Sequence, residues 1–285
     1  MKQLHEIRRQ KEAMNTLFDV TNIFEGIASM HISKIKNNVL QAQGFFNELW
    51  HIYSQLRVDQ NFHYGRTMQE GSVIDKDLII TITAEGGFSG DIDQKLINVL
   101  LEQHDPKTQD IITVGRHGAV QLAQRGVSFK RYLKLPEKDQ NFNVNPLVKE
   151  VQRYRSTTVY YQTYVSLTIQ DVKRISLSAA VQEQGKSAGK SDEFISEKTY
   201  IFEPSTFAVI DHLERSMLNI ALSQVIFESK LAQYASRFRS MTAASDRAEE
   251  ALHDLELTYN RTNRALKDER LKEILNGRRY AGRTL

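Results

Sequence analysis

Two glycine-rich segments are the first candidates for chemistry, because loops of this kind bind phosphate groups through their backbone N–H groups. One is 85–90, Glu-Gly-Gly-Phe-Ser-Gly, which follows a β-branched run and precedes an amphipathic segment. Its glycines do not have the Gly-x-Gly-x-x-Gly spacing of a dinucleotide-binding turn. Asp91 and Asp93 also place negative charge where an anionic ligand would bind. We therefore expect a structural turn and not a nucleotide site.

The second glycine-rich segment is 185–191, Gly-Lys-Ser-Ala-Gly-Lys-Ser. A P-loop needs four residues between its first glycine and the Gly-Lys pair, and here only three intervene. The segment also lies within a polar run, 182–193, between two expected strands, whereas a P-loop opens a helix directly after a strand. We expect a hairpin loop.

The composition gives no support to a metal site, a cysteine nucleophile, a membrane span or a nucleic-acid interface. The absence of cysteine excludes thiolate metal sites and cysteine nucleophiles, and no two of the eight histidines lie three to five residues apart. No apolar run approaches the roughly 18 residues that span a bilayer, and no apolar signal-peptide region follows the N-terminus. A net charge of +3 does not by itself indicate nucleic-acid binding. The sequence predicts no catalytic residue, no metal and no cofactor.

The C-terminal segment has the strongest pattern in the chain. All four prolines lie between residues 106 and 204, so both ends are free to form long helices. From about residue 205 to 276, apolar residues follow a heptad repeat with charged residues between them, which is typical of a coiled coil. The two series of core positions are Met217, Gln224, Leu231, Phe238, Ser245, Leu252, Tyr259 and Leu266, and Leu213, Ile220, Phe227, Tyr234, Met241, Ala248, Leu255 and Thr262. We expect the seam to include Leu231, Tyr234, Phe238, Met241, Leu252, Leu255 and Tyr259.

The N-terminal segment is the expected partner, and it should pair antiparallel because a domain lies between the two helices. Its apolar residues recur at intervals of three, four or seven. They are Ile7, Met14, Leu17, Val20, Phe24, Ile27, Ala28, Ile35, Val39, Phe46, Leu49, Tyr53 and Leu56.

The middle of the chain alternates between strand and helix patterns, which predicts a mostly parallel α/β sheet. We expect strands at 77–83, 110–115, 127–135, 157–167, 172–181 and 198–202. Helices are expected at 91–103, through 119–123 with an end near Gly126, and at 145–155, and Ser205 is the expected N-cap of the C-terminal helix.

Several of these residues together resemble one family, the gamma subunits of F-type ATP synthases. The C-terminal segment resembles that family's C-terminal helix at 228–232 (Glu-Ser-Lys-Leu-Ala), Ala235, Arg237, Met241, Ala244, Asp246, Ala248, Leu252, Leu255, Leu257 and 259–260 (Tyr-Asn). Similar family motifs stand at 203–205, 85–90, 115–118, 160–166 with Gln170, and at Ile7, Arg8, Arg9, Ala13, Met14, Val20, Thr21, Ile27 and Ala28. The resemblance covers nearly the whole chain in the same order.

The resemblance implies an antiparallel two-helix coiled coil, formed by 1–60 and 204–285, with an inserted Rossmann-like α/β domain at 61–203. It implies a non-catalytic rotor shaft that transmits torque in a proton- or sodium-translocating ATP synthase or ATPase, peripheral to the cytoplasmic face of a membrane. The implied partners are the alpha and beta subunits of the catalytic head, an epsilon-type subunit and the membrane ring of c subunits.

The same resemblance implies contacts with the head at Val20, Thr21, Phe24, Asn263, Arg264 and Asp268. Some of these positions depart from the family pattern. Asn263 and Arg264 stand where the family has Arg-Gln, and Asn22, Glu25 and His31 stand where it usually has lysine. The head contacts are therefore expected to be rebuilt, either in a divergent or alternative-type member or by ordinary drift in a housekeeping synthase.

Two other classes of function stay open from the residues alone. One is a small-molecule enzyme with helical dimerisation arms, which would have a ligand pocket at 86–90. The other is a non-catalytic coiled-coil scaffold that forms homodimers through its helices.

Overall fold

Two very long helices and a five-stranded sheet make up the computed structural model, which describes residues 2–55, 74–136, 143–177, 203 and 205–281. In chain order the elements are α1 (Lys2–Gln55), β1 (Ile74–Ile82), α2 (Ile92–Gln103), β2 (Gln109–Val114), α3 (Arg116–Gln124), β3 (Arg131–Leu133), α4 (Asn145–Val151), β4 (Tyr154–Tyr164), β5 (Gln170–Ser176) and α6 (Thr206–Ala281). The chain divides into a helical unit, residues 1–27 with 238–285, and a sheet unit, residues 28–237. Both α1 and α6 contribute to each unit.

The sheet has the order β3-β2-β1-β4-β5. The pairs β1–β2, β1–β4 and β2–β3 are parallel, with Ile80 opposite Ile112 on one side and Val159 on the other. Only β5 is antiparallel in this sheet, because the short 165–169 turn returns the chain beside β4. This confirms the mostly parallel α/β sheet that the sequence predicts.

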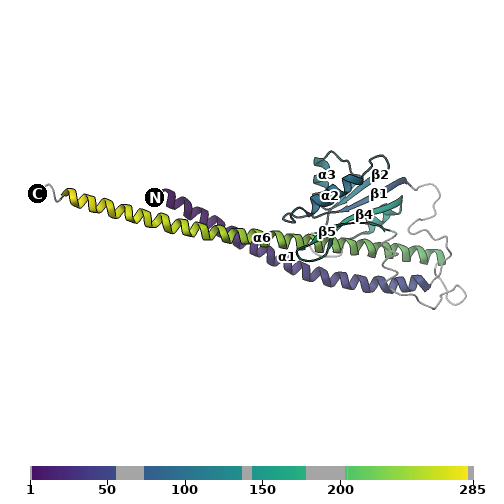
Figure 1. Cartoon of the computed structure of the whole chain (residues 1–285). Coiled ribbons are helices and arrows are strands. Elements are labelled where there is room, and N and C mark those ends of the chain that lie inside the picture. Colours follow the sequence, from purple (N-terminus) through teal and green to yellow (C-terminus); the bar gives the residue numbers. More distant parts are fainter. Residues whose placement is uncertain (1, 56–73, 137–142, 178–202, 204, 282–285) are drawn as a thin grey trace. The chain divides into compact units, whose positions relative to one another are not determined.

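The sheet lies between two layers of helices (Figure 1), and alternate side chains of its central strands pack against each layer. Leu78 and Ile80 of β1 pack in a core with Phe46 of α1, with α4 and with α6. Ile79, between them, packs on the opposite face with residues of α2 and α3. Since successive side chains of a strand point to opposite faces, the run from Leu78 to Ile82 is buried throughout.

Within the sheet unit, α1 also packs directly on α6. Ile35 is fully buried against Phe227 and Leu231, and the His31 ring stacks on Tyr234 with centroids 4.5 Å apart. Within the helical unit, Arg8 donates to Tyr259 Oη, Lys11 to Glu256, and Ser245 to Asn22. As the α1 number rises along this series, the α6 number falls by the same amount. The two helices are therefore antiparallel and in register, as predicted.

The start of α6 is set by the predicted N-cap, because Ser205 Oγ accepts a hydrogen bond from Ala208 N at 3.2 Å. Other predicted boundaries are wrong by a few residues. The helix expected at 145–155 ends at Val151, and β4 already begins at Tyr154. The strand expected at 127–135 contains only three paired residues, Arg131–Leu133. Tyr154 is buried in the sheet core, so the chain leaves the helix before this residue. The segment after Gly126 first bonds back to α3, because Val127 N donates to Leu122 O, and only 131–133 pair with β2.

Four sequence-based predictions lie outside the described residues. They are the strand at 198–202, the hairpin loop at 185–191, the end of the strand at 172–181, and the N-terminal seam position Leu56. Val39 and Tyr53 lie within α1, but their side chains are outside the description. The domain boundaries at 60–61 and 203–204 stay predictions.

Candidate functional site

The heptad positions of α6 are the first part of the candidate site. None of the sixteen predicted core positions is exposed, and Met241 and Ala248 in the helical unit are 6% and 2% exposed. The seam residues Phe238, Leu252, Leu255 and Tyr259 are partly buried, and Leu231 and Tyr234 are buried and partly buried in the sheet unit. A seam that is filled along its length holds the two helices at a fixed separation.

The facing seam of α1 differs from the prediction. The buried positions in the helical unit are Ile7 and Thr21, with Met14 partly buried between them, a spacing of seven throughout. Leu17, Val20 and Ile27 were expected in the seam, but they are 48%, 40% and 39% exposed. The helix carries two apolar faces, and the seven-residue spacing of Ile7, Met14 and Thr21 is the signal that distinguishes the inner one.

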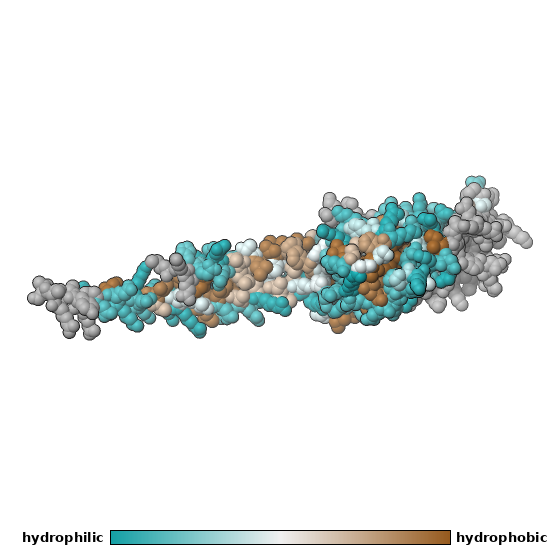
Figure 2. Space-filling view, turned by 90° about the horizontal axis from the view of Figure 1, so that it is seen from above, coloured by the Kyte–Doolittle hydropathy of each residue, from teal (hydrophilic) through white to brown (hydrophobic). Residues whose placement is uncertain are grey.

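The outer face of α1 is an apolar stripe of Leu17, Val20, Ile23 and Ile27, in which Ile23 is 62% exposed. Intervals of three and four residues place these side chains on one side of the helix. Apolar side chains interrupt the largely hydrophilic surface of the helices in Figure 2. The sequence placed Leu17, Val20 and Ile27 in the seam, because a helix pattern alone does not show which apolar face packs on the partner helix.

The C-terminal end of α6 is a second exposed apolar surface. Beyond the contact between Arg8 and Tyr259, α6 continues past the start of α1 (Figure 1), and residues 267–276 are all exposed. Leu271, Ile274 and Leu275 are 59%, 64% and 54% exposed on one side of this end. A single helix with an uncovered apolar side is typical of a segment that binds another protein.

The six predicted head-contact residues lie at two levels of the helical unit. Val20, Thr21 and Phe24 lie near the contact between Asn22 and Ser245, whereas Asn263, Arg264 and Asp268 lie beyond Tyr259. The helix rise puts roughly 27 Å between the two levels. Arg264 and Asp268 are exposed, but Thr21 is only 4% exposed and donates to Phe18 O. Contact with a partner stays a prediction for all six.

In the sheet unit, the glycine-rich turn at 85–90 is covered by α6. Arg237 Nε donates to Gly87 O at 3.0 Å and its Nη2 to Gly86 O at 3.3 Å, while Ser236 Oγ donates to Ser89 O at 2.8 Å. Three carbonyl groups of the turn are therefore occupied by a helix of the same chain. This supports the predicted structural turn.

A buried polar network continues from this turn to α6. Asp93, 2% exposed, accepts hydrogen bonds from Ala84 N at 3.1 Å, His117 Nδ1 at 2.8 Å and Gln162 Nε2 at 2.7 Å. Gln162 Oε1 in turn accepts from the hydroxyl of Ser229 on α6. Asp93 raises the pKa of His117 chiefly through this hydrogen bond. The carboxylate that was expected only to repel an anion thus fixes the helix to the sheet.

A close backbone approach requires glycine at two positions after β2. A Cβ on Gly115, where φ is +93°, would lie 1.9 Å from Thr83 O, and a Cβ on Gly118 would lie 2.8 Å from Thr83 Oγ1. The same hydroxyl accepts the Gly118 N–H at 2.9 Å and donates to Val114 O at 3.1 Å. These contacts explain why glycines flank 116–117 in this sequence.

Within residues 2–55, 74–136, 143–177 and 205–281, no three metal-binding side chains form a cluster. None of the helices in this part of the chain is long and apolar enough to cross a membrane. The described geometry thus defines a class of protein: an antiparallel pair of long helices from the two ends of one chain, with an α/β sheet inserted between them and bonded to one of them.

Comparison with known proteins places this class in a family. The family model described as ATP synthase matches residues 3–279, and the chain belongs to that family. It is 24% identical to the ATP synthase gamma chain of Chloroherpeton thalassium and 22% identical to that of Geotalea uraniireducens, with 97% of this chain aligned in each case. The alignments cover 97% and 98% of these relatives.

A solved structure has the same fold. It is the Euglena gracilis mitochondrial ATP synthase, OSCP/F1/c-ring, in which one chain matches with a TM-score of 0.65 and 18% identity over 99% of this chain and 97% of that chain. The antiparallel helices and the inserted parallel sheet are therefore those of a gamma-type subunit fold.

Proposed function

We propose that this chain is the central rotor shaft of a rotary ATP synthase or ATPase, which transmits torque between a membrane rotor ring and a catalytic head. The observation that carries the proposal is α6, one helix of 76 residues that packs into the sheet core at one end and forms the coiled coil at the other. At 1.5 Å per residue it is on the order of 110 Å long. A helix continuous between two units can transmit a twist applied at either one.

The surface of the helical unit supports this role. The outer side of α1 carries an apolar stripe, whereas exposed α6 positions such as Glu249 and Glu250 are charged. A shaft with unlike sides presents a different surface to each of three equivalent catalytic sites. Different contacts at each site bias its conformation, which is a coupling free energy between the shaft and the chemistry.

The polar network in the sheet unit supports the other end of the mechanism. Torque that enters at the sheet has to reach α6 without slipping, and the hydrogen bonds through Asp93, Gln162 and Ser229 oppose such movement. Tyr161 and Thr163 of β4 also donate to Glu228 of α6. Because buried hydrogen bonds of this kind are costly to break, they fix the helix more firmly than apolar packing alone.

The partners in this proposal are the alpha and beta subunits of the head, an epsilon-type subunit and a ring of c subunits. The chain is non-catalytic, and the complex moves protons or sodium ions at the cytoplasmic face of a membrane. Neither an enzyme pocket at 86–90 nor a homodimeric scaffold is favoured by a specific observation.

Native mass spectrometry of the chain, purified from its own membranes by an affinity tag, tests the proposal. The expected particle contains three alpha chains, three beta chains and one copy of this chain, with ATPase activity in the same fraction. A lone chain or a homodimer without a nucleotide-hydrolysing partner would refute the shaft role.

A further inference from the structure

The apolar stripe of α1 is left exposed within the part of the chain that the structure describes. Its least exposed member, Ile27, is 39% exposed, and Ile23 is 62% exposed. The seam with α6 takes another side of the helix, on which Ile7 and Thr21 are buried. Apolar side chains that gather on one exposed side of a helix are typical of a surface that binds another protein.

The segment that carries the stripe is acidic. No lysine or arginine lies between Lys11 and Lys34, whereas Glu12, Asp19 and Glu25 are negatively charged. Asp19 lies one helical turn before Ile23, so this carboxylate borders the stripe. Neither Asp19 nor Glu25 forms an ion pair with another described residue, and Lys11 is already paired with Glu256 at 2.8 Å.

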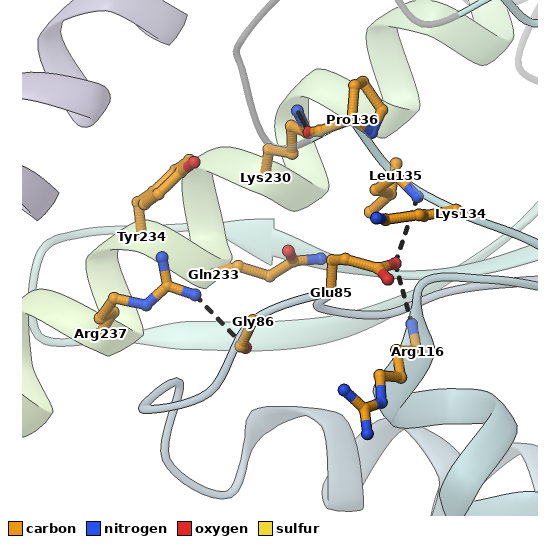
Figure 3. Close-up of a pocket in the computed structure, with 10 residues that line it drawn as sticks. All are labelled: Glu85, Gly86, Arg116, Lys134, Leu135, Pro136, Lys230, Gln233, Tyr234 and Arg237. Atoms are coloured by element: carbon orange, nitrogen blue, oxygen red, sulfur yellow. Dashed lines mark hydrogen bonds between the residues drawn. The ribbon is translucent and has the colours of Figure 1, made fainter.

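The part of α6 in the same unit has the same sign of charge. Between 238 and 255 its charged residues are four carboxylates and two arginines: Asp246, Glu249, Glu250, Asp254, Arg239 and Arg247. Residues 12–27 and 238–255 therefore hold seven carboxylates against two arginines, a net charge of −5, whereas the whole chain has +3. The next cation along α6, Arg237, belongs to the sheet unit, where it donates to Gly86 O (Figure 3).

These charges decide what kind of partner fits the stripe. A second copy of this chain would bring like charge against the same segment, and an anionic lipid surface would do so as well, which is unfavourable in both cases. A partner that complements both features has aliphatic side chains bordered by lysine or arginine. The stripe also contains Val20, one of the residues predicted to contact the head, so it is continuous with that expected contact.

We propose that the apolar stripe of α1 docks on an apolar segment of the catalytic head whose border is basic. This inference rests on the proposed shaft function, and it names the chemistry of the surface that the head presents to the shaft. The aliphatic contact supplies the binding free energy by excluding water, while the acidic border favours the approach of a basic segment and disfavours an acidic one. A contact of only a few side chains is small, as is typical of contacts that form and break repeatedly.

Association of the purified full-length chain with a purified head of alpha and beta subunits from the same source tests the inference, measured by biolayer interferometry at several ionic strengths. Asp19→Lys should slow association about threefold at low ionic strength and have no effect at high ionic strength, because charges at the rim of a contact act mainly on the association rate. Ile23→Gln should weaken binding about tenfold at every ionic strength, since it removes an aliphatic side chain from the contact. Both residues are exposed, so the variants should fold, which circular dichroism can check.

Glu102→Lys and Val120→Gln are the matched controls. They make the same kinds of change at exposed positions of α2 and α3 in the sheet unit, and they should leave association and affinity unchanged.

Two results would overturn the inference and leave the shaft function standing. Faster association of Asp19→Lys would identify an acidic partner, and an Ile23→Gln variant that binds as tightly as the parent, or no more weakly than Val120→Gln, would remove the stripe from the contact. A parent chain that dimerises and becomes monomeric on Ile23→Gln would assign the stripe to a second copy instead. Absence of any binding between the parent chain and the head would refute the shaft function itself, and this inference with it.

Discussion

Gln162 is the residue whose replacement tests most sharply how the sheet fixes α6. Its amide joins Asp93 to the helix, because Nε2 donates to Asp93 and Oε1 accepts from Ser229 and from Gln233 Nε2. The side chain is fully buried. Gln162→Leu keeps a similar volume but removes every one of these hydrogen bonds.

The expected loss of stability follows from the hydrogen bonds that the substitution removes. Losing the bond to the buried carboxylate costs about 1.5–3 kcal/mol. The Ser229 hydroxyl loses its acceptor, although it still accepts from Gln233 Nε2, and this costs about 1 kcal/mol more. Burial of the leucine offsets about 1 kcal/mol. The free energy of unfolding should therefore fall by about 1.5–3 kcal/mol, which lowers the unfolding midpoint by roughly 3–12 °C in a unit of this size.

Chemical denaturation of the full chain measures this loss, with Gln124→Leu as the control because Gln124 is exposed on α3. The control should change stability by less than about 0.5 kcal/mol. In the assembled complex, ion uptake driven by ATP should fall more than ATP hydrolysis does, because an α6 that is held less firmly by the sheet transmits less torque. If Gln162→Leu is as stable and as well coupled as the parent, the network does not anchor α6 and this reasoning is wrong.

Three further predictions concern the seam, pH and the head contacts. Met241→Ala should lower the free energy of unfolding by about 2–4 kcal/mol, because Met241 is buried in the seam. Leu257→Ala, at a position that is 42% exposed, should lower it by less than about 1 kcal/mol. Equal losses for the two variants in denaturant titrations would contradict the assignment of Met241 to the seam. The raised pKa of His117 means that its protonation stabilises the fold below about pH 6.5, and that this stabilisation is lost as pH rises through the raised pKa. His117→Gln should remove it, so the parent and the variant should differ most in stability at low pH. A difference between them that grows with pH would have the wrong sign. Arg264→Ala should lower the coupled ATPase activity of the complex and leave the unfolding midpoint of the chain unchanged, since Arg264 is exposed; an unchanged activity would remove it from the head contacts.

The parts of the fold that the sequence predicted are those with strong periodicity. The heptads of α6 extend over many turns, so a single misplaced residue does not shift the pattern, and all their core positions are indeed covered. The central strands were predicted because a β-branched run such as 77–83 has few alternatives. The end of α4 was missed because burial of Tyr154 in the sheet, and not local propensity, decides where this short helix stops. The extent of β3 was missed because it depends on pairing with β2 over three residues.

The candidate site was harder to predict, because it depends on contacts between distant segments. The turn at 85–90 was interpreted as structural, but nothing in its residues shows that Ser236 and Arg237 of α6 bond to it. Asp93 was interpreted only through its charge, whereas its four hydrogen-bond donors come from three other parts of the sheet unit. The outer stripe of α1 was assigned to the seam because Leu17 and Val20 fit a three-four spacing as well as the true seam does.

Rotation of this chain within the assembled complex is the most direct test of the proposed shaft function. The natural sequence has no cysteine, so Asn98→Cys, at an exposed position of α2, gives the chain one attachment point for a visible probe. With the head fixed to a surface and ATP supplied, we expect the probe to rotate in one direction with three dwells per turn, and to stay still without ATP. A probe that stays still, or only fluctuates, while the same particles hydrolyse ATP would show that this chain is not the rotor shaft.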